Sequence, residues 1–495
     1  MDILKRLKAC RRVSVPIVVY TTPDQNGSVS MICDGINGGS PKLQWDFCQG
    51  VKPINEEGSA ALAAANIDPE DTVANPAGMI QSALQLPPKT ILFVKNAQRF
   101  IDDVGFIQAV CNCRDAFKAD KRTLVLMGVG ITLPPELSTD VFTIDEELPD
   151  EEQLRQVIAD AYRAIDREAD EETLQRGAGA LKGISLFQAE QITYTSLTPD
   201  GLDFDEVWNQ KKSAVEQGPG MELYRGIDAF DQLGGLQALK DFCVRSINNR
   251  RNNNPLFRPK GVFLLGVPGT GKSAFAKALG NETGRPTLLL DVGALMGSLV
   301  GQSEENTRQA LKVVYAMSPC ILFCDEIEKA FSGVGDSGDS GVSTRLFGTF
   351  LTWLNDHTSD VFVVCTCNDI SKLPPEFSRA ERFDGIFFLD LPGESERAQI
   401  WDIFERLYEV EKQERPNDEG WTGAEIRACC RMSAILGVSL VDAGVYIVPV
   451  SSTSKEKVDS LKNWARNRCL DANQPGMFQN TIASQPLAVR TRNVG

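Results

Sequence analysis

A glycine-rich segment in the second half of the chain has the residue types and spacing of a phosphate-binding loop. It reads Gly266-Val267-Pro268-Gly269-Thr270-Gly271-Lys272-Ser273 and fits the pattern GxxxxGK[ST]. It lies between an apolar run, Val262–Leu265, and a helical pattern over 274–279. Backbone N–H groups and a helix N-terminus favour phosphate, so Lys272 would reach the β- and γ-phosphates and Ser273 would ligate Mg²⁺. We therefore predict a nucleoside triphosphate site formed by Pro268, Gly269, Thr270, Gly271, Lys272 and Ser273.

Two carboxylates and an amide follow later apolar runs. Asp325 and Glu326 come after Ile321-Leu322-Phe323-Cys324, and Asn368 comes after Val361–Cys367. Open α/β sheets bind ligands at the carboxyl ends of their strands, where Asp325 would join the Mg²⁺ site and Glu326 would polarise the attacking water. Asn368 would sense the γ-phosphate and orient that water. Alone, two acids indicate a solvated loop and an asparagine a turn, but their position after the glycine-rich segment favours catalysis.

Short apolar runs alternate with helical patterns in this half of the chain. Runs without polar alternation suit strands that are buried on both faces of a parallel sheet. Between two of these runs, Ala310, Leu311, Val314 and Tyr315 recur at helical spacing. The alternation predicts an α/β fold with a doubly wound parallel sheet. The predicted strands are Val262–Leu265, Thr287–Val292, Cys320–Cys324, Val361–Cys367 and Ile386–Leu389.

The first half of the chain repeats this order in a diverged form. Two segments of the first half resemble segments of the second half, namely Thr90–Val94 with Cys320–Cys324 and Leu133–Leu137 with Leu373–Phe377. No GxxxxGK pattern follows the predicted strand Ile17–Tyr20, and Lys95-Asn96 stands where the second half has Asp325-Glu326. We interpret the first half as a copy that lacks the nucleotide site. Two unrelated α/β domains are the alternative.

Composition limits the classes of function. The 495 residues carry a formal net charge of −16, which argues against extensive contacts with nucleic-acid phosphates. The length indicates two or three domains. No apolar run of about 18 residues indicates a membrane span, and the N-terminus lacks the apolar core of a secretory signal. We expect a cytoplasmic protein, or one of a stroma-like soluble compartment of a plastid.

Cysteine and histidine usage limits the chemistry. The count of 13 cysteines is odd and no CxxC pair occurs, which indicates reduced thiols. Cys365 and Cys367, near Cys324, leave a zinc site as the alternative, although they lack zinc-ligand spacing and histidine support. The one histidine, His357, is predicted to be a solvated loop residue. A histidine base is therefore nearly excluded.

In this order, the motifs from 223 to 440 resemble those of the AAA clade of AAA+ ATPases. Phe230-Asp231-Gln232-Leu233-Gly234-Gly235 resembles the segment that opens the family's ATPase domain, in which the backbone of Leu233 and Gly234 would hold adenine. The resemblance implies ATP as substrate and Mg²⁺ as cofactor. It also implies a homo-oligomer, which we expect to be a hexamer.

Two further segments carry the resemblance. The segment 375–384 resembles the family's second region of homology, and there Arg379 and Arg382 would be arginine fingers that enter the neighbouring subunit's site. Trp421-Thr422-Gly423-Ala424-Glu425-Ile426 resembles the lid segment that closes over the nucleotide at Gly423 and Ala424.

The whole chain is closer still to a subfamily, the AAA proteins found as a hypothetical chloroplast reading frame in algal plastids and in cyanobacteria. In that subfamily the first half also lacks the phosphate-binding loop. The segments that carry this resemblance are Gly338–Gly341, Arg345–Phe350, Trp353-Leu354, Ile447–Ser451 and Leu461–Ala465.

Three features depart from the family's pattern or extend it. Leu299 stands where many threading machines have an aromatic residue that grips polypeptide, which argues against strong mechanical unfolding. Glu381 stands where the family usually has glycine, which would alter how Arg382 is presented. The Gly-, Asp- and Ser-rich segment Gly333–Gly341 would be either a pore loop that contacts a client or a plain surface loop.

The predicted organisation and function follow from these patterns. We predict an ATP-hydrolysing ring protein that remodels or regulates a protein partner. One alternative is an ATP-gated switch or scaffold with slow hydrolysis, and another is a nucleic-acid motor, which the net charge opposes. The predicted parts are a degenerate AAA-like domain (1–200), a linker (201–222), a large ATPase domain (223–394), a helical lid (395–470) and a flexible tail (471–495).

Overall fold

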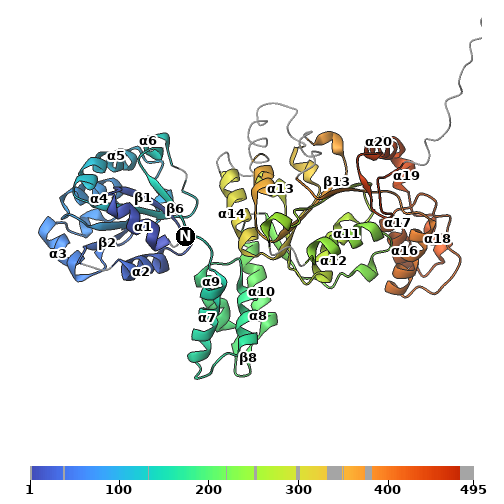
Figure 1. Cartoon of the computed structure of the whole chain (residues 1–495), viewed down its shortest axis with the longest axis horizontal. Helices are drawn as coiled ribbons and strands as arrows, with labels where there is room; N and C mark the ends of the chain where they lie inside the picture. The colour runs from blue at the N-terminus through green and yellow to red at the C-terminus, as the bar shows by residue number, and fades with distance from the viewer. Residues whose placement is uncertain are drawn as a thin grey trace, which may run out of the picture. The chain divides into compact units, whose positions relative to one another are not determined.

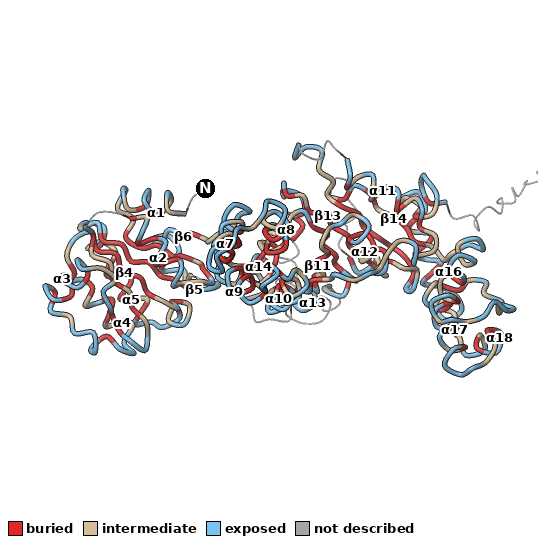
Figure 2. Tube along the Cα trace, turned by 90° about the horizontal axis from the view of Figure 1, so that it is seen from below, coloured by how far each residue is buried: buried red, intermediate tan, exposed pale blue. Residues whose placement is uncertain are grey.

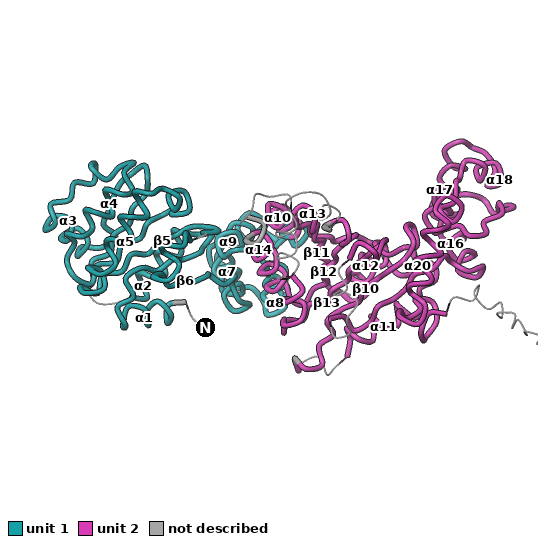
Figure 3. Tube along the Cα trace, turned by 90° about the horizontal axis from the view of Figure 1, so that it is seen from above, with its two compact units in different colours: residues 1–207 teal, residues 208–495 magenta. Residues whose placement is uncertain are grey.

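The chain forms two compact units, Met1–Val207 and Trp208–Gly495, which are described separately (Figure 3). The computed structural model describes residues 3–36, 39–131, 133–218, 220–249, 254–296, 302–331, 348, 350–373 and 382–479. In both units the central strands of the sheet are buried, while the outer faces of the helices are exposed (Figure 2).

Unit 1 contains a six-stranded sheet in the order β3-β2-β4-β5-β1-β6. Its pairs are parallel except β2 with β3. The strands are β1 (Ile17–Thr21), β2 (Lys42–Asp46), β3 (Gly50–Pro53), β4 (Ile91–Val94), β5 (Thr123–Gly128) and β6 (Phe142–Asp145). The helices around this sheet are α1 (Ile3–Arg12), α2 (Gln25–Gly35), α3 (Glu56–Ala65), α4 (Pro76–Ser82), α5 (Val104–Ala119) and α6 (Pro135–Ser138).

Both faces of this sheet are covered. Ile17 and Val19 pack into one core with residues of α3, α4 and α5, whereas Val18 and Tyr20 pack into a second core with residues of α1 and α2. Successive side chains of a strand point to opposite faces, so a strand between two helical layers must be apolar throughout. This burial on both faces explains why Ile17–Tyr20 is apolar without interruption.

The rest of unit 1 is helical (Figure 1). Helices α7 (Glu151–Arg163), α8 (Glu171–Leu181) and α9 (Leu186–Thr195) are followed by a short hairpin of β7 (Leu197–Thr198) and β8 (Gly201–Leu202). Helix α7 begins with a capping box, in which Asp150 and Gln153 each accept the other's backbone N–H.

Helix α10 (Phe204–Glu216) occupies most of the segment 201–222, for which the sequence predicts a linker. Its buried positions Val207, Lys211 and Val215 recur every four residues. A lysine therefore stands in the middle of the apolar stripe, and its ammonium lies 4.5 Å from the ring centre of Trp208. That charged residue hides the helical period in the sequence.

Unit 2 contains a seven-stranded sheet in the order β15-β14-β10-β13-β12-β11-β9. Its pairs are parallel except β9 with β11. The strands are β9 (Met221–Tyr224), β10 (Gly261–Gly266), β11 (Thr287–Leu290), β12 (Cys320–Cys324), β13 (Val361–Cys367), β14 (Gly385–Leu389) and β15 (Leu470–Asp471). The helices beside it include α11 (Gln237–Ile247), α12 (Lys272–Glu282), α13 (Val292–Met296) and α14 (Gln302–Ala316). The five strands predicted in this half are confirmed, with β11 two residues shorter than expected.

The two sheets share one strand order. Reading from the edge that carries the antiparallel strand, unit 1 has β2-β4-β5-β1-β6 and unit 2 has β11-β12-β13-β10-β14. In both units the first strand of the parallel set lies fourth in this order, so the crossovers are the same. This agreement supports the diverged repeat over two unrelated α/β domains.

Five helices follow β14 and form the lid, drawn from orange to red in Figure 1. They are α16 (Glu394–Leu407), α17 (Gly423–Leu436), α18 (Leu440–Gly444), α19 (Val450–Thr453) and α20 (Lys455–Ala465). The lid has its own apolar core, which contains Trp401, Trp421, Ile426 and Leu440. The lid thus packs as a layer of its own beside the sheet.

After the lid the chain returns to the sheet. Strand β15 pairs with β14, Ala472 is buried, and Phe478 packs on Phe388 with ring centres 4.5 Å apart. Residues 471–479 were expected to begin a flexible tail, and these contacts order them. Residues 480–495 lie outside the described part of the chain.

Candidate functional site

The glycine-rich loop of unit 2 joins β10 to α12, as predicted. Gly269 and Gly271 have φ of 84° and 94°, values that favour glycine. Gly271 is the N-cap of α12 and provides no side-chain cap. A Cβ atom at Gly269 would lie 2.9 Å from Thr422 Oγ1 and 3.0 Å from Ala424 Cβ. The glycines therefore allow both the turn and the close approach of the lid.

Lys272 is the first residue of α12 and its side chain is buried. Its Nζ donates hydrogen bonds to the carbonyl oxygens of Gly266, at 2.8 Å, and Val267, at 2.9 Å. Burial lowers the pKa of Lys272 to about 8, while neighbouring Cys367, Glu328 and the pair Asp325 and Glu326 act to raise it. The Lys272 ammonium therefore lies within the glycine-rich loop, whose backbone N–H groups also favour an anion.

Asp325 follows β12 and meets Ser273. The hydroxyl of Ser273 donates to the two carboxylate oxygens of Asp325, at 3.2 and 3.0 Å. Thr366 of β13 donates its hydroxyl to Asp325 Oδ1 at 2.5 Å. A hydroxyl and a carboxylate side by side are the hard oxygen ligands that Mg²⁺ takes beside phosphate.

Glu326 adopts a left-handed backbone with φ of 46°, which is unusual for a residue other than glycine. Its N–H donates to Thr366 Oγ1 at 2.8 Å, and Asn368 Nδ2 donates to its Oε1 at 2.8 Å. Lys329 also contacts its carboxylate. The backbone N–H of Asn368 donates to Glu328 Oε1 at 2.8 Å. This turn therefore places the Glu326 carboxylate, which Asn368 holds, beside Asp325 at the carboxyl ends of β12 and β13.

A second wall of the site comes from the segment before α11. Lys240 Nζ donates to the carbonyl oxygens of Leu233, at 2.5 Å, and Phe230, at 3.1 Å. Gln399 of α16 accepts the N–H of Gly235 at 3.1 Å. A Cβ atom at Gly234 would lie 2.7 Å from Ile400 Cγ1, so this backbone packs directly on the lid.

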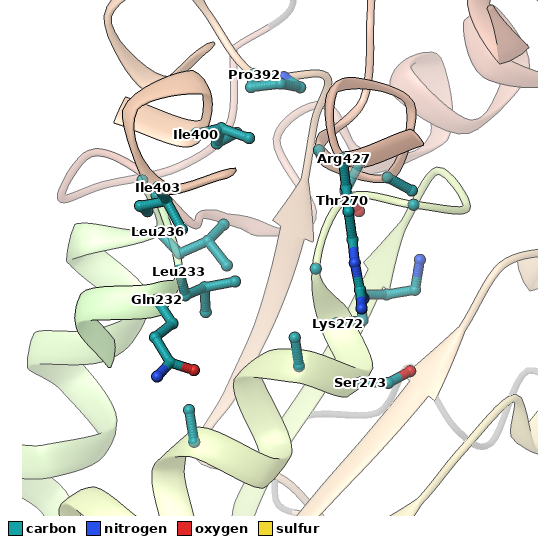
Figure 4. A pocket seen from close by; sticks show the side chains of 18 of the residues that line it. Gln232, Leu233, Leu236, Thr270, Lys272, Ser273, Pro392, Ile400, Ile403 and Arg427 are labelled. Carbon is teal, nitrogen blue, oxygen red and sulfur yellow. The ribbon is translucent and has the colours of Figure 1, made fainter. Parts of the chain in front are cut away.

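These parts enclose a cavity of about 790 Å³, within the range of small-molecule sites. The apolar side chains of Leu233, Leu236 and Ile400 lie on one side of it, and Lys272 and Ser273 on the other (Figure 4). The predicted residues that line it together are Leu233, Gly234, Pro268, Gly269, Thr270, Gly271, Lys272, Ser273, Asp325, Glu326, Asn368, Gly423 and Ala424.

The lid closes one end of this cavity through the start of α17. Thr422 caps this helix and forms a capping box with Glu425. The N–H of Ala424 donates to the carbonyl oxygen of Gly269 at 3.2 Å, which joins the lid directly to the glycine-rich loop. Arg427, one turn further along α17, also lines the cavity and donates its Nε to Tyr408 at 3.2 Å.

Other predicted positions lie elsewhere. Arg379, Glu381, Leu299 and the segment Gly333–Gly341 fall outside the described residues. Arg382 is half-buried ahead of β14 and is not one of the residues that line the cavity.

His357 lies in a loop, as predicted, but it is not the solvated residue that was expected. Its ring is half-buried and stacks on Trp353 with ring centres 4.5 Å apart, and its Nδ1 lies 3.2 Å from Ser359 Oγ. Trp353 precedes it by one helical turn, a spacing that brings the two rings together. That spacing was the available signal in the sequence.

The cysteines carry free thiols, and most are buried. Burial raises the pKa of Cys320 and of Cys430 to about 12, so that their thiols stay protonated. Over the described residues, no group of three or more His, Cys, Asp and Glu side chains is arranged to hold a metal ion. Nor does that part of the chain contain a helix with the length and apolar character needed to cross a membrane.

Thr366, Gln399 and Asn473 contribute to the site and were not predicted. Thr366 of β13 bonds to both Asp325 and Glu326, whereas Gln399 of α16 and Asn473, just after β15, each accept one backbone N–H from the segment before α11. Thr366 had one signal, because it is the polar residue in the apolar run Val361–Cys367. The other two lie in surroundings with no pattern that marks them.

Comparisons with known proteins agree with this geometry. Residues 262–391 match the ATPase family associated with various cellular activities (AAA), and residues 3–146 match the N-terminal domain of SpoVK-like AAA ATPases. The AAA domain-containing protein ycf46 of Guillardia theta is 28% identical over 94% of this chain and 95% of its own. The ycf46 protein of Trieres chinensis is 32% identical over 77% and 78%, respectively. The peroxisomal ATPase PEX6 of Mus musculus is 32% identical over 43% of this chain and 22% of its own length.

Proposed function

Because the chain belongs to the AAA ATPase family, whose members generally hydrolyse ATP, we propose that it binds ATP with Mg²⁺ and hydrolyses it to ADP and phosphate. We propose further that it does so as a homo-oligomer, expected to be a hexamer, which remodels or regulates a partner protein. One observation carries the proposal: Lys272, the pair Ser273 and Asp325, and the pair Glu326 and Asn368 line the same cavity.

The residues present fit the magnesium–nucleotide complex. The loop 267–271 leaves the N-terminus of α12 without a side-chain cap, so that its N–H groups are available to a phosphate. Ser273 and Asp325 would hold Mg²⁺, which would neutralise charge on the bound phosphates. Leu233, Leu236 and Ile400 offer an apolar wall to a base.

The chemistry of the proposed reaction lies with Glu326 and Asn368. Phosphoryl transfer needs a positioned nucleophile and compensation of charge more than covalent help. Glu326 would accept a hydrogen bond from the attacking water. Asn368 donates its Nδ2 to this carboxylate and would sense the γ-phosphate. Lys272 would compensate the charge of the β- and γ-phosphates. Arg379 and Arg382 of a neighbouring subunit would complete the site, in keeping with the position of Arg382 away from its own cavity.

The substitution Glu326→Gln tests the proposal. It keeps the shape of the side chain and the bond from Asn368 but removes the charge that polarises water. We expect ATP to bind as in the wild type while turnover falls about 10²–10⁴-fold, the usual range for a positioned base. The measurements are fluorescent-nucleotide binding and phosphate release, and Glu328→Gln, a change at the neighbouring carboxylate, is a matched comparison. Wild-type turnover in Glu326→Gln would remove Glu326 from the mechanism.

One observation favours the slower, ATP-gated switch as the second candidate. Lys329 contacts the Glu326 carboxylate, and this bond is the main cause that raises the pKa of Lys329. A carboxylate that already holds a cation polarises water less strongly. If a partner protein is captured or released on ATP binding alone, in Glu326→Gln as in the wild type, that result would favour the ATP-gated switch.

A further inference from the structure

Leu236 lies at the cavity in a strained conformation. Its φ of 61° is left-handed, a conformation that an aliphatic residue keeps only where the surrounding structure holds it. Leu236 is also the N-cap of α11, where its side chain cannot cap the helix. The side chain is buried in the core of unit 2 and lines the cavity. Something outside this turn must therefore hold its backbone in place.

The backbone of Leu236 is held by Asn473, from the segment that returns after the lid. Asn473 Oδ1 accepts the N–H of Leu236 at 2.7 Å. The two residues before Asn473 make further bonds that fix this segment. Asp471 Oδ1 accepts the N–H of Asn473 at 2.8 Å, and the carbonyl oxygen of Ala472 accepts the N–H of Leu239 at 3.0 Å. Asn473 is therefore held in place by contacts other than its own bond to Leu236.

Asn473 also lines the cavity. Its side chain is half-buried, and a Cβ atom at Gly235 would lie 3.2 Å from its Oδ1, closer than most Cβ contacts, while the φ of 73° at Gly235 also favours glycine. The wall that Leu233 and Gly234 present to the cavity depends on the turn that Asn473 fixes. Gln399 and Lys240 hold the same wall from the lid and from α11.

We propose that Asn473 is a positioning residue of the nucleotide site. It holds Leu236 left-handed, and thereby sets the backbone of residues 233–235 against the base of the nucleotide. Affinity for the nucleotide then depends on the docking of the chain that follows the lid. The inference rests on the proposed function, because it takes the occupant of the cavity to be a nucleotide.

The experiment compares Asn473→Ala, Asn473→Asp and Gln474→Ala in the full chain. In Asn473→Ala we expect faster amide hydrogen exchange over 233–239. We also expect a rise of about three- to tenfold in the Kd for mant-ATP, the scale of one lost hydrogen bond, and a higher KM with an unchanged kcat. Asn473→Asp keeps an acceptor oxygen in the same place and should restore slow exchange. Gln474 is exposed, and Gln474→Ala should behave as the wild type.

Two results would overturn the proposal. One is an Asn473→Ala variant with unchanged exchange over 233–239 or unchanged mant-ATP affinity. The other is a loss of kcat at unchanged KM, which would assign Asn473 to the reaction rather than to binding. Failure of the proposed function gives a different result, because wild-type protein would then show no affinity for mant-ATP.

Discussion

The two units carry the same strand order, and they end their equivalent strands with opposite chemistry. In unit 2, β10 leads into a glycine-rich loop, and the N-cap of α12 is Gly271, without a side-chain cap. In unit 1, β1 leads to Asp24, whose carboxylate accepts the N–H of Gly27 at 2.9 Å and caps α2. A carboxylate at a helix N-terminus fills the place where a phosphate would bind. The N-terminus of α2 is therefore closed by its own aspartate, whereas the N-terminus of α12 is left open to an anion.

The strand ends that face these caps differ in the same way. Asn96 of unit 1 and Glu326 of unit 2 are both second after their strands, and both are left-handed, with φ of 54° and 46°. The two units therefore share this backbone turn but differ in its charge, because unit 1 has Lys95-Asn96 at the positions where unit 2 has Asp325-Glu326. Lys95 and Asn96 bond to Asn26 and Gln25 of α2 instead. The comparison teaches that one backbone turn can serve a carboxylate of a nucleotide-type site in one unit and a purely structural contact in the other.

The largest expected effect is on the affinity for nucleotide, which should depend on unit 2 and not on unit 1. Lys272→Ala should weaken mant-ATP binding about tenfold to a hundredfold, since a bond to a charged group contributes about 1.5–3 kcal/mol. Lys95→Ala, a change of a lysine at the strand ends of unit 1, should leave the affinity unchanged, because the Lys95 ammonium bonds to Asn26 of α2 and not to residues of the cavity. Equal losses in both variants would show that unit 1 also takes nucleotide.

A smaller effect concerns the rate of hydrolysis. Lys329→Ala frees the Glu326 carboxylate from its cation and should raise phosphate release at saturating ATP by up to about fivefold, the scale of an exposed ion pair. Arg99 stands at the corresponding position of unit 1, and Arg99→Ala should not change the rate. A rate that falls in Lys329→Ala would mean that the lysine assists the reaction.

A third comparison concerns stability alone. Asp24→Ala removes the cap of α2 and should lower the free energy of unfolding by about 0.5–2 kcal/mol. Nucleotide affinity should stay as it is, since the capped end lies in unit 1. Urea unfolding read by hydrogen exchange of α2 measures the loss, with the exposed Asp34→Ala as control. Stronger mant-ATP binding in Asp24→Ala would instead show that the cap alone keeps nucleotide out.

The smallest effect reports on unit 2 only, because the chain has one histidine. Burial, with Lys260 nearby, lowers the pKa of His357 below its usual 6.5. The unfolded chain then binds more protons below pH 6.5, so this contribution to stability is complete above that pH and is lost as the pH falls toward the lowered pKa. Urea unfolding at pH 5.5 and 7.5 should show a smaller difference in His357→Gln than in the wild type. An equal difference would remove His357 from the acid sensitivity of unit 2.

Much of the fold could be predicted from the sequence, since apolar runs between two helical layers are continuous and easily recognised. The glycine-rich loop, Asp325, Glu326 and Asn368 were predictable for a related reason, because each directly follows such a run. The helix over 204–216 was missed, since Lys211 occupies a core position. The role of Asn473 was missed because the hydrogen bond to Leu236 joins residues far apart in the chain, and no local pattern records that contact.

The return of the chain to β15 makes the lid an insertion between two neighbouring strands of one sheet. Both of its connections, after β14 and before β15, therefore leave from the same edge of the sheet. A lid attached at two adjacent points can swing about the line that joins them but cannot twist freely, as it could on a single connection.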